Sequence, residues 1–107
     1  MYKRQSLIRA LHPTPAVCGL PRVKANNFIL KNENYKRTFY TGFLGELNLK
    51  DSESNVQYSQ LYVNLRCMEV DENKASIFVG GGITKDSNAE KEWEETVFKT
   101  KTMKRVL

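Results

Sequence analysis

Three consecutive glycines, Gly80 to Gly82, follow the apolar run Ile77-Phe78-Val79 and precede a segment with helical patterning. Because glycine has no Cβ, backbone N–H groups at such a position can approach a ligand closely. The spacing is not that of a dinucleotide-binding G-x-G-x-x-G loop. Taken alone, the triplet fits a bulge or a sharp turn as well as a binding loop. The segment that follows therefore decides between these interpretations.

A helix is predicted after the glycines and continues to the C-terminus. Ser87 and Glu90 match a capping box, which is a start signal for a helix. At about 100° per residue, Glu92, Glu95 and Lys99 fall in one sector of this helix. The apolar members of the same sector should face the protein interior; they are Met103, Val106 and Leu107.

Inward-facing carboxylates are costly unless they are paired or bound to a metal. Glu92 and Glu95, one turn apart, suit a hard cation such as Mg2+, and Lys99 is placed to neutralise a substrate carboxylate. The alternative is an ordinary surface ion pair between Glu95 and Lys99, because pairs at this helical spacing are common. The spacing leaves both interpretations open, and the glycine triplet favours an anion-and-metal site.

The length of 107 residues predicts one domain at most. No apolar run is long enough to span a membrane, and the N-terminus lacks the apolar core of a signal peptide. Cys18 and Cys67 make neither a disulfide framework nor a zinc site. We therefore expect two reduced thiols in a cytoplasmic protein that has no membrane partner.

The net charge of +5 is concentrated in the first half of the chain. A basic half can indicate nucleic acid, but these basic residues are scattered and accompany no nucleic-acid-reading motif. Anionic small molecules or an acidic partner surface explain the charge equally well. We expect no nucleic-acid partner, and a basic nucleic-acid-binding module is kept as an alternative.

The predicted elements give an α/β fold of the α+β type, with antiparallel strands and flanking helices. A first helix ends at Leu11, because Pro13 and Pro15 disfavour helix in the residues before them. A second helix covers Arg22 to about Lys31. Three strands are predicted, and we expect them to form an antiparallel meander; their ranges are Arg37–Leu49, Tyr58–Val70 and Ala75–Val79.

With these segments in place, the chain resembles the C-terminal part of the chorismate-utilising enzymes, and most closely the isochorismate synthases. Four segments carry the resemblance in the family's order: Leu11–Pro21, Phe39–Gly45, Leu61–Arg66 and Gly80–Lys99. The resemblance covers nearly the whole chain. It implies that residues 1–107 form the C-terminal portion of a chorismate-binding domain.

The resemblance also implies roles for individual residues. Glu95 would bind Mg2+ directly, and Glu92 would support the metal directly or through water. Chorismate carboxylates would be bound by Arg66, whose guanidinium forms a bidentate fork, and by further residues. These further residues are Tyr40, Gly80, Gly82 and Lys99. From the residues alone, a surface arginine and a core tyrosine would be the simpler interpretations of Arg66 and Tyr40.

Ala16 bears on the reaction that the resemblance implies. Family members that eliminate pyruvate, the anthranilate and salicylate synthases, typically carry threonine here, whereas Ala16 in His-Pro-Thr-Pro-Ala resembles isochorismate synthases. Those enzymes isomerise chorismate to isochorismate for menaquinone or siderophore synthesis. Water adds at one ring carbon as hydroxide leaves another, which requires a general base, a general acid and Mg2+.

The family's general acid, general base and remaining Mg2+-binding glutamate lie upstream of the matched region. The ten residues before Leu11 match none of those motifs. We therefore expect the chain to be inactive alone and to need the N-terminal portion of the domain. Two alternatives remain: part of a pyruvate-releasing chorismate enzyme, or a non-catalytic binding or regulatory piece.

Overall fold

The computed structural model describes residues 2–107, which form four helices and four strands. The elements in chain order are α1 (Tyr2–Leu11), α2 (Arg22–Asn32), β1 (Phe43–Lys50), β2 (Gln57–Val63), β3 (Cys67–Asp71), β4 (Lys74–Phe78), α3 (Ala89–Lys99) and α4 (Lys101–Lys104). Both strand pairs are antiparallel, so the predicted α+β class is confirmed.

The two predicted N-terminal helices are confirmed. α1 ends at Leu11, directly before the segment that contains Pro13 and Pro15. α2 follows Pro21, which is the N-cap residue with φ −65° and ψ 140° rather than the first residue of the helix. Proline fits the start of a helix because its missing N–H would have no partner there.

The first predicted strand is wrong over residues 37–42, which form turns before β1 begins at Phe43. Thr38 and Thr41 have left-handed φ values of 50° and 64°, far from the φ of regular extended backbone. The backbone N–H of Tyr40 donates to the Arg37 carbonyl (2.9 Å), and that of Gly42 donates to the Phe39 carbonyl (3.0 Å). These turns bring Tyr40 and Thr41 into the interior.

The second predicted strand is wrong as a single element, because the chain bends between β2 and β3 at residues 64–66. Arg66 has a left-handed φ of 46°. β2 pairs with β1, and β3 pairs with β4, so the described residues form two separate two-stranded sheets. The predicted three-stranded meander is therefore wrong, since β2 and β3 do not pair.

The predicted capping box is also wrong, because the N-cap of α3 is Asn88. The Asn88 side chain accepts a hydrogen bond from the backbone N–H of Lys91 (3.0 Å), as an N-cap does. The Ser87 hydroxyl accepts from the backbone N–H of Thr84 instead (2.9 Å). Thr100 keeps helical dihedral angles between α3 and α4, so the helix prediction for this region holds up to Lys104.

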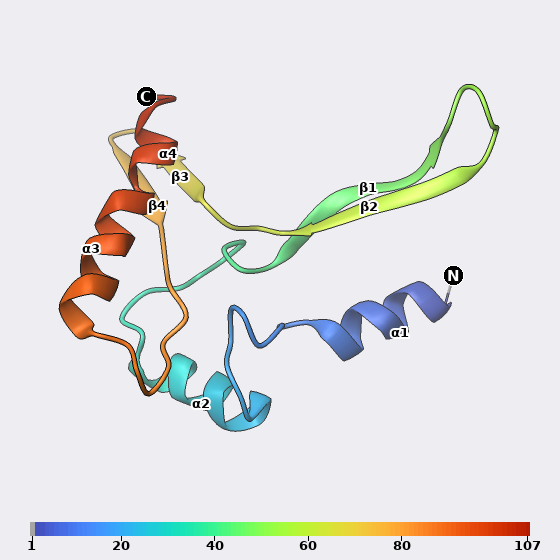
Figure 1. Cartoon of the computed structure of the whole chain (residues 1–107). Coiled ribbons are helices and arrows are strands. Elements are labelled where there is room, and N and C mark those ends of the chain that lie inside the picture. Colours follow the sequence, from blue (N-terminus) through green and yellow to red (C-terminus); the bar gives the residue numbers. More distant parts are fainter. Residues whose placement is uncertain (1) are drawn as a thin grey trace.

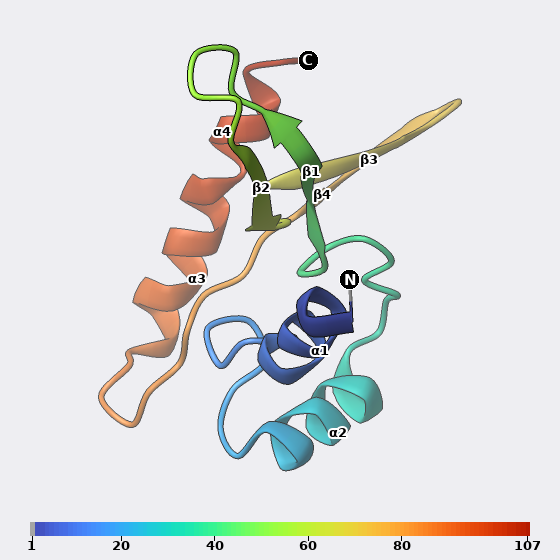
Figure 2. The same cartoon turned by 90° about the vertical axis from the view of Figure 1, so that its right-hand side faces the viewer.

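The elements are arranged openly. Figure 1 shows the β1–β2 hairpin projecting as an arm, with α1 beneath it and α3 and α4 on the other side of the molecule. Figure 2, a quarter turn away, shows α1 and α2 below the strands and α3 with α4 along one side of them. Among residues 3–107, whose burial the structure describes, only Tyr40 and Thr41 are buried.

None of the helices within residues 2–107 is both long and apolar enough to cross a lipid bilayer.

Candidate functional site

Tyr40 is at the centre of the candidate site. Its ring stacks on Phe78 of β4, with ring centroids 5.4 Å apart and an interplanar angle of 25°. Burial raises the pKa of Tyr40, so the phenol remains protonated at neutral pH and can donate a hydrogen bond. The ring is thus held by packing while its hydroxyl lies beside the backbone of Gly80. This arrangement suits a polar contact to a ligand.

A cavity of about 230 Å³ opens beside Tyr40. Five separate stretches of the chain line it, and the lining residues are Ala16, Val17, Arg37, Tyr40, Thr41, Leu65, Gly80, Gly81, Gly82 and Lys99. A smaller cavity of about 60 Å³ shares Tyr40, Gly80 and Lys99 with the first and adds Arg66. The structure therefore brings together the five predicted substrate-binding residues and Ala16, and their roles remain predictions.

Lys99 connects the last helix to the glycine triplet. Its Nζ donates to the Gly80 carbonyl oxygen (3.0 Å) and forms an ion pair with Glu95 Oε1 (2.6 Å). An ammonium group has three N–H donors, so these two contacts leave a third for a ligand in the cavity. The surface-pair interpretation and the binding interpretation of Lys99 are therefore compatible. The ion pair forms, and the same side chain lines the cavity.

The two predicted metal-binding carboxylates lie near the glycines but differ in exposure. Glu92 is half-buried, and its Oε2 is 3.4 Å from the point that a Cβ on Gly81 would occupy. The Glu95 side chain is 52% exposed. No group of three or more His, Cys, Asp or Glu side chains within residues 2–107 is arranged to hold a metal ion. The assignment of the pair to Mg2+ therefore remains a prediction.

The inward-facing sector of the last helix is confirmed only in part. Glu92, Lys99 and Met103 are half-buried, as predicted, whereas Glu95 is exposed, so the prediction that it faces inward is wrong. Val106 and Leu107 are 70% and 74% exposed, so the prediction that they face the interior is wrong. They lie beyond α4, which ends at Lys104, and the helical spacing on which the prediction depends no longer applies there.

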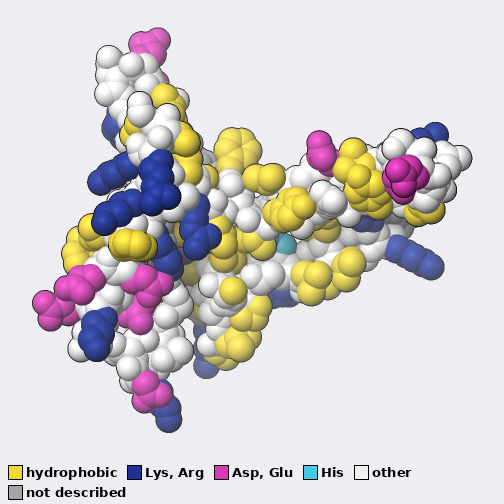
Figure 3. Space-filling model, turned by 45° about the horizontal axis from the view of Figure 1, so that its top comes forward, with side chains coloured by type: hydrophobic (Ala, Val, Ile, Leu, Met, Phe, Trp, Pro, Cys, Tyr) yellow, Lys and Arg dark blue, Asp and Glu magenta, His cyan; other side chains and the backbone are white. Residues whose placement is uncertain are grey.

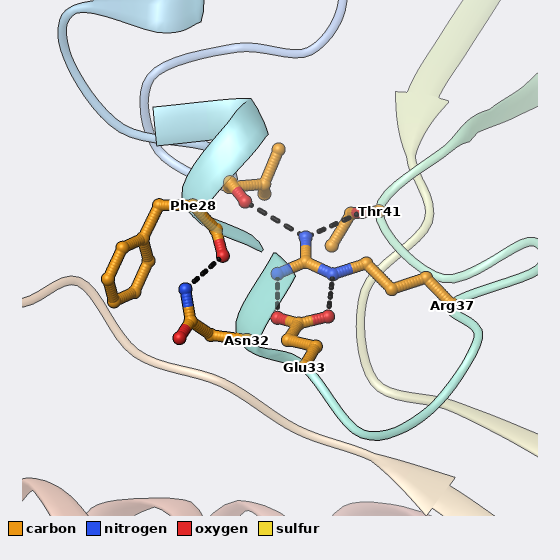
Figure 4. Close-up of polar contacts among 6 residues, drawn as sticks. Phe28, Asn32, Glu33, Arg37 and Thr41 are labelled. Carbon is orange, nitrogen blue, oxygen red and sulfur yellow. Dashed lines mark hydrogen bonds and ion pairs between the residues drawn. The ribbon is translucent and has the colours of Figure 1, made fainter. Parts of the chain in front are cut away.

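Sequence reasoning missed Arg37, which cross-links the walls of the cavity. Figure 4 shows its guanidinium bound in a fork to both carboxylate oxygens of Glu33, with Nε to Oε2 at 2.8 Å. Nη1 donates to the Val17 carbonyl and to the Thr41 hydroxyl, both at 3.1 Å. The bond to Glu33 is the main cause of a raised Arg37 pKa. Arg37 thus fixes the loop that carries Ala16 against the turn that carries Tyr40.

The glycine triplet gives a matched pair of substitutions. A Cβ on Gly80 would lie 2.7 Å from the Tyr40 hydroxyl oxygen, whereas a Cβ on Gly82 would meet nothing within 4 Å. Gly80→Ala is therefore expected to displace the Tyr40 ring, which is held by Phe78, and Gly82→Ala is expected to leave it in place. NMR shifts of the Tyr40 and Phe78 ring protons provide the measurement. Equal shifts in the two variants would contradict the arrangement described here.

Comparison with known proteins gives related sequences over nearly the whole chain. Residues 2–107 match the family described as chorismate binding enzyme. The vibriobactin-specific isochorismate synthase of Vibrio cholerae is 40% identical over 93 residues, which are 87% of this chain and 22% of the relative. Isochorismate synthase DhbC of Bacillus subtilis is 37% identical over 101 residues, 94% of this chain and 24% of the relative.

Isochorismate synthase EntC of Escherichia coli K12 is 38% identical over 93 residues, again 87% of this chain and 22% of the relative. The chain therefore spans roughly a quarter or less of the length of these relatives. No solved structure matches the chain.

Proposed function

The chain belongs to the family of chorismate binding enzymes, and from this premise we propose that it supplies one wall of the chorismate site of an isochorismate synthase. The observation that carries the proposal is the cavity beside Tyr40. Side chains and backbone from five separate stretches of the chain meet there, including Ala16, Tyr40, Gly80 and Lys99. Relatives with printed isochorismate synthase names match the chain over most of its length.

Chorismate carries two negatively charged carboxylates, and positively charged hydrogen-bond donors border the two cavities. Lys99 has a remaining N–H donor, and Arg66 borders the adjoining cavity with a guanidinium that can hold a carboxylate in a fork. Tyr40 contributes a neutral hydroxyl, Gly80 lines the same cavity, and the backbone of Gly82 is open to a ligand. In the proposed site, Lys99 and Arg66 neutralise the carboxylates while Tyr40 orients the substrate.

We assign Glu95 and Glu92 to Mg2+, with Glu95 as the direct ligand. Both are hard oxygen donors one helical turn apart, and Mg2+ is commonly held by one or two carboxylates plus water and substrate oxygens. The ion, when bound, would supply positive charge to a substrate carboxylate. Glu95 is paired with Lys99 in the structure, so Mg2+ would share or replace this contact.

The lining of the two cavities supports a source of proton transfer in another part of the enzyme. No histidine, aspartate or glutamate is among the described residues that line either cavity. Lys99 is engaged with Glu95 and Gly80, and Arg37 is held by Glu33. We therefore propose that the 107-residue chain binds chorismate but needs a general acid and a general base from another part of the enzyme.

Ala16 supports isomerisation as the reaction of the complete site. Its methyl group borders the cavity and offers no hydroxyl there, whereas threonine would add one. We propose that this apolar border belongs to a site that retains the enolpyruvyl group of chorismate. Such a site would release isochorismate and not pyruvate.

Calorimetry and product analysis with the 107-residue chain test the proposal. Titration with chorismate in the presence of Mg2+ is expected to give a binding heat that diminishes when Mg2+ is withheld. Chromatography of the same mixture is expected to show neither isochorismate nor pyruvate. A folded chain that gives no heat would refute the binding proposal. Turnover would refute the statement that the acid and base lie elsewhere.

A further inference from the structure

Arg37 joins three parts of the chain through one guanidinium group. Its Nε donates to Glu33 Oε2 at 2.8 Å, and its Nη2 donates to Glu33 Oε1. Its Nη1 donates to the Val17 carbonyl oxygen and to the Thr41 hydroxyl, both at 3.1 Å (Figure 4). These contacts use four of the five N–H groups that a guanidinium carries. Arg37 is therefore suited to hold parts of the chain together rather than to bind a substrate itself.

The two walls that Arg37 holds carry Ala16 and Tyr40. Val17 directly follows Ala16, and both residues line the cavity of about 230 Å³. On the other wall, Thr41 follows Tyr40, and the Arg37 Cζ lies 5.6 Å from the centroid of the Tyr40 ring. A guanidinium at this distance is attracted to the ring face. The separation between Ala16 and Tyr40 across the cavity thus depends on Arg37.

Packing alone does not fix this separation. Ala16 is exposed and Val17 is only half-buried, so few neighbours hold their loop in place. Arg37 and Thr41 also border a second, larger cavity of about 680 Å³. In a close-packed interior, a shifted segment would meet other atoms at once. Beside Arg37 there is open space, so the loop is free to move when the hydrogen bonds of the guanidinium are lost.

We propose that Arg37 is a positioning residue for chorismate, which sets the width of the cavity through Val17 and Tyr40. The inference rests on the proposed function, because that function identifies the ligand. Binding groups must be held within roughly 0.5 Å of their productive geometry, and a shell of hydrogen-bonded residues behind them provides this precision. Glu33 completes the arrangement, because its two carboxylate oxygens fix the plane of the guanidinium.

Calorimetry with substituted chains tests this role. Arg37→Met is expected to weaken chorismate binding in the presence of Mg2+ on the order of tenfold. Arg37→Lys should recover little of this loss, because an ammonium group lacks the planar fork that reaches Glu33 and Val17 together. Arg9→Met is the matched control: Arg9 is exposed on α1, and its replacement also removes one positive charge. Equal losses in Arg37→Met and Arg9→Met would overturn the proposal.

Chemical rescue distinguishes positioning from a general loss of structure. Guanidinium chloride at low millimolar concentration should restore part of the chorismate affinity of Arg37→Ala, because the free ion fits between Glu33 and Val17. Methylammonium chloride at the same concentration carries the same charge without the fork and should restore none. Equal recovery with the two salts would contradict the proposed role of the fork.

A double-mutant cycle tests whether Arg37 acts through Tyr40. Tyr40→Phe is expected to weaken chorismate binding roughly fivefold in the unsubstituted chain, which is the usual effect of losing one neutral hydrogen bond. In Arg37→Met the same change should cost less than about twofold, because the hydroxyl is already out of place. Losses that are equal in the two backgrounds would mean that Arg37 does not position Tyr40.

NMR without chorismate shows which parts of the chain move. The Ala16 methyl and Tyr40 ring resonances should shift together in Arg37→Met, whereas those of Leu47 should be unchanged. Leu47 is 52% exposed on the β1–β2 arm, and Figure 3 shows apolar side chains exposed along this arm. Where Leu47 shifts as well, the milder Thr41→Val decides: it removes one acceptor of Arg37 and should weaken chorismate binding roughly threefold.

These measurements separate the role of Arg37 from the proposed function. An unsubstituted, folded chain that gives no heat with chorismate would refute the function, and the resonances of Ala16 and Tyr40 would still report whether Arg37 holds the two walls. A chain that binds chorismate equally well with arginine or methionine at residue 37 would retain the function and overturn the positioning role.

Discussion

Replacing Lys99 with methionine is expected to weaken chorismate binding by about 10- to 100-fold. The substitution retains a long apolar side chain but removes the charge that lines the cavity. Hydrogen bonds to charged groups are worth about 1.5–3 kcal/mol, and each 1.4 kcal/mol corresponds to a tenfold change in affinity. The loss should appear in the dissociation constant for chorismate that calorimetry measures with the chain.

Lys101→Met is the matched control for the Lys99 substitution. Lys101 lies on the same helical segment with its Nζ 4.9 Å from the Phe98 ring centroid, and it does not line either site cavity. Lys101→Met removes one positive charge and leaves the residues that line the cavities unchanged. If the two variants lost equal affinity, general electrostatic attraction would explain the binding and the assignment of Lys99 would be wrong. Because Lys99→Met also frees Glu95 from its ion pair, Mg2+ affinity is not expected to fall with chorismate affinity.

Local patterns in the sequence predicted the helices better than the strands. Prolines fix the end of α1 and the start of α2, and helical spacing places Glu92 and Lys99 on one side of α3. The strand errors come from residues 37–42 and 64–66. Left-handed φ values at Thr38, Thr41 and Arg66 interrupt extended backbone there. These residues are not glycine, so no local signal announces the turns.

Only part of the candidate site could be predicted from the sequence, because many of its contacts join residues that are far apart in the chain. Spacing alone connects Glu95 with Lys99, whereas Ala16 and Tyr40 became candidates through resemblance to a family. Arg37 was missed because its role depends on contacts with Val17, far away in the sequence. One local signal was present: Glu33 and Arg37 have the spacing of a helical ion pair, but Arg37 was assigned to a strand. Contacts between residues that are far apart in the chain leave no periodic pattern in the sequence, so spacing cannot predict them.

Substituting Gly45 with alanine should disrupt the β1–β2 hairpin more than any other alanine replacement of a glycine in this chain. A Cβ at this position would lie 1.9 Å from the Gln60 carbonyl oxygen and 2.9 Å from the Leu61 Cα. Both obstacles are backbone atoms of the paired strand, so relief requires the strands to separate. We expect the free energy that stabilises the hairpin to fall by at least about 2 kcal/mol, which is within the usual cost of overpacking.

Hydrogen exchange distinguishes this local effect from general unfolding. Amides of β1 and β2 should exchange at least tenfold faster in Gly45→Ala, whereas those of α3 should be unchanged. Glu46→Ala is the control, since it places alanine on the next, exposed residue of the same strand. Unchanged exchange would mean that β1 accommodates the methyl group in a different register. The pairing of Leu44 with Tyr62 would then be wrong.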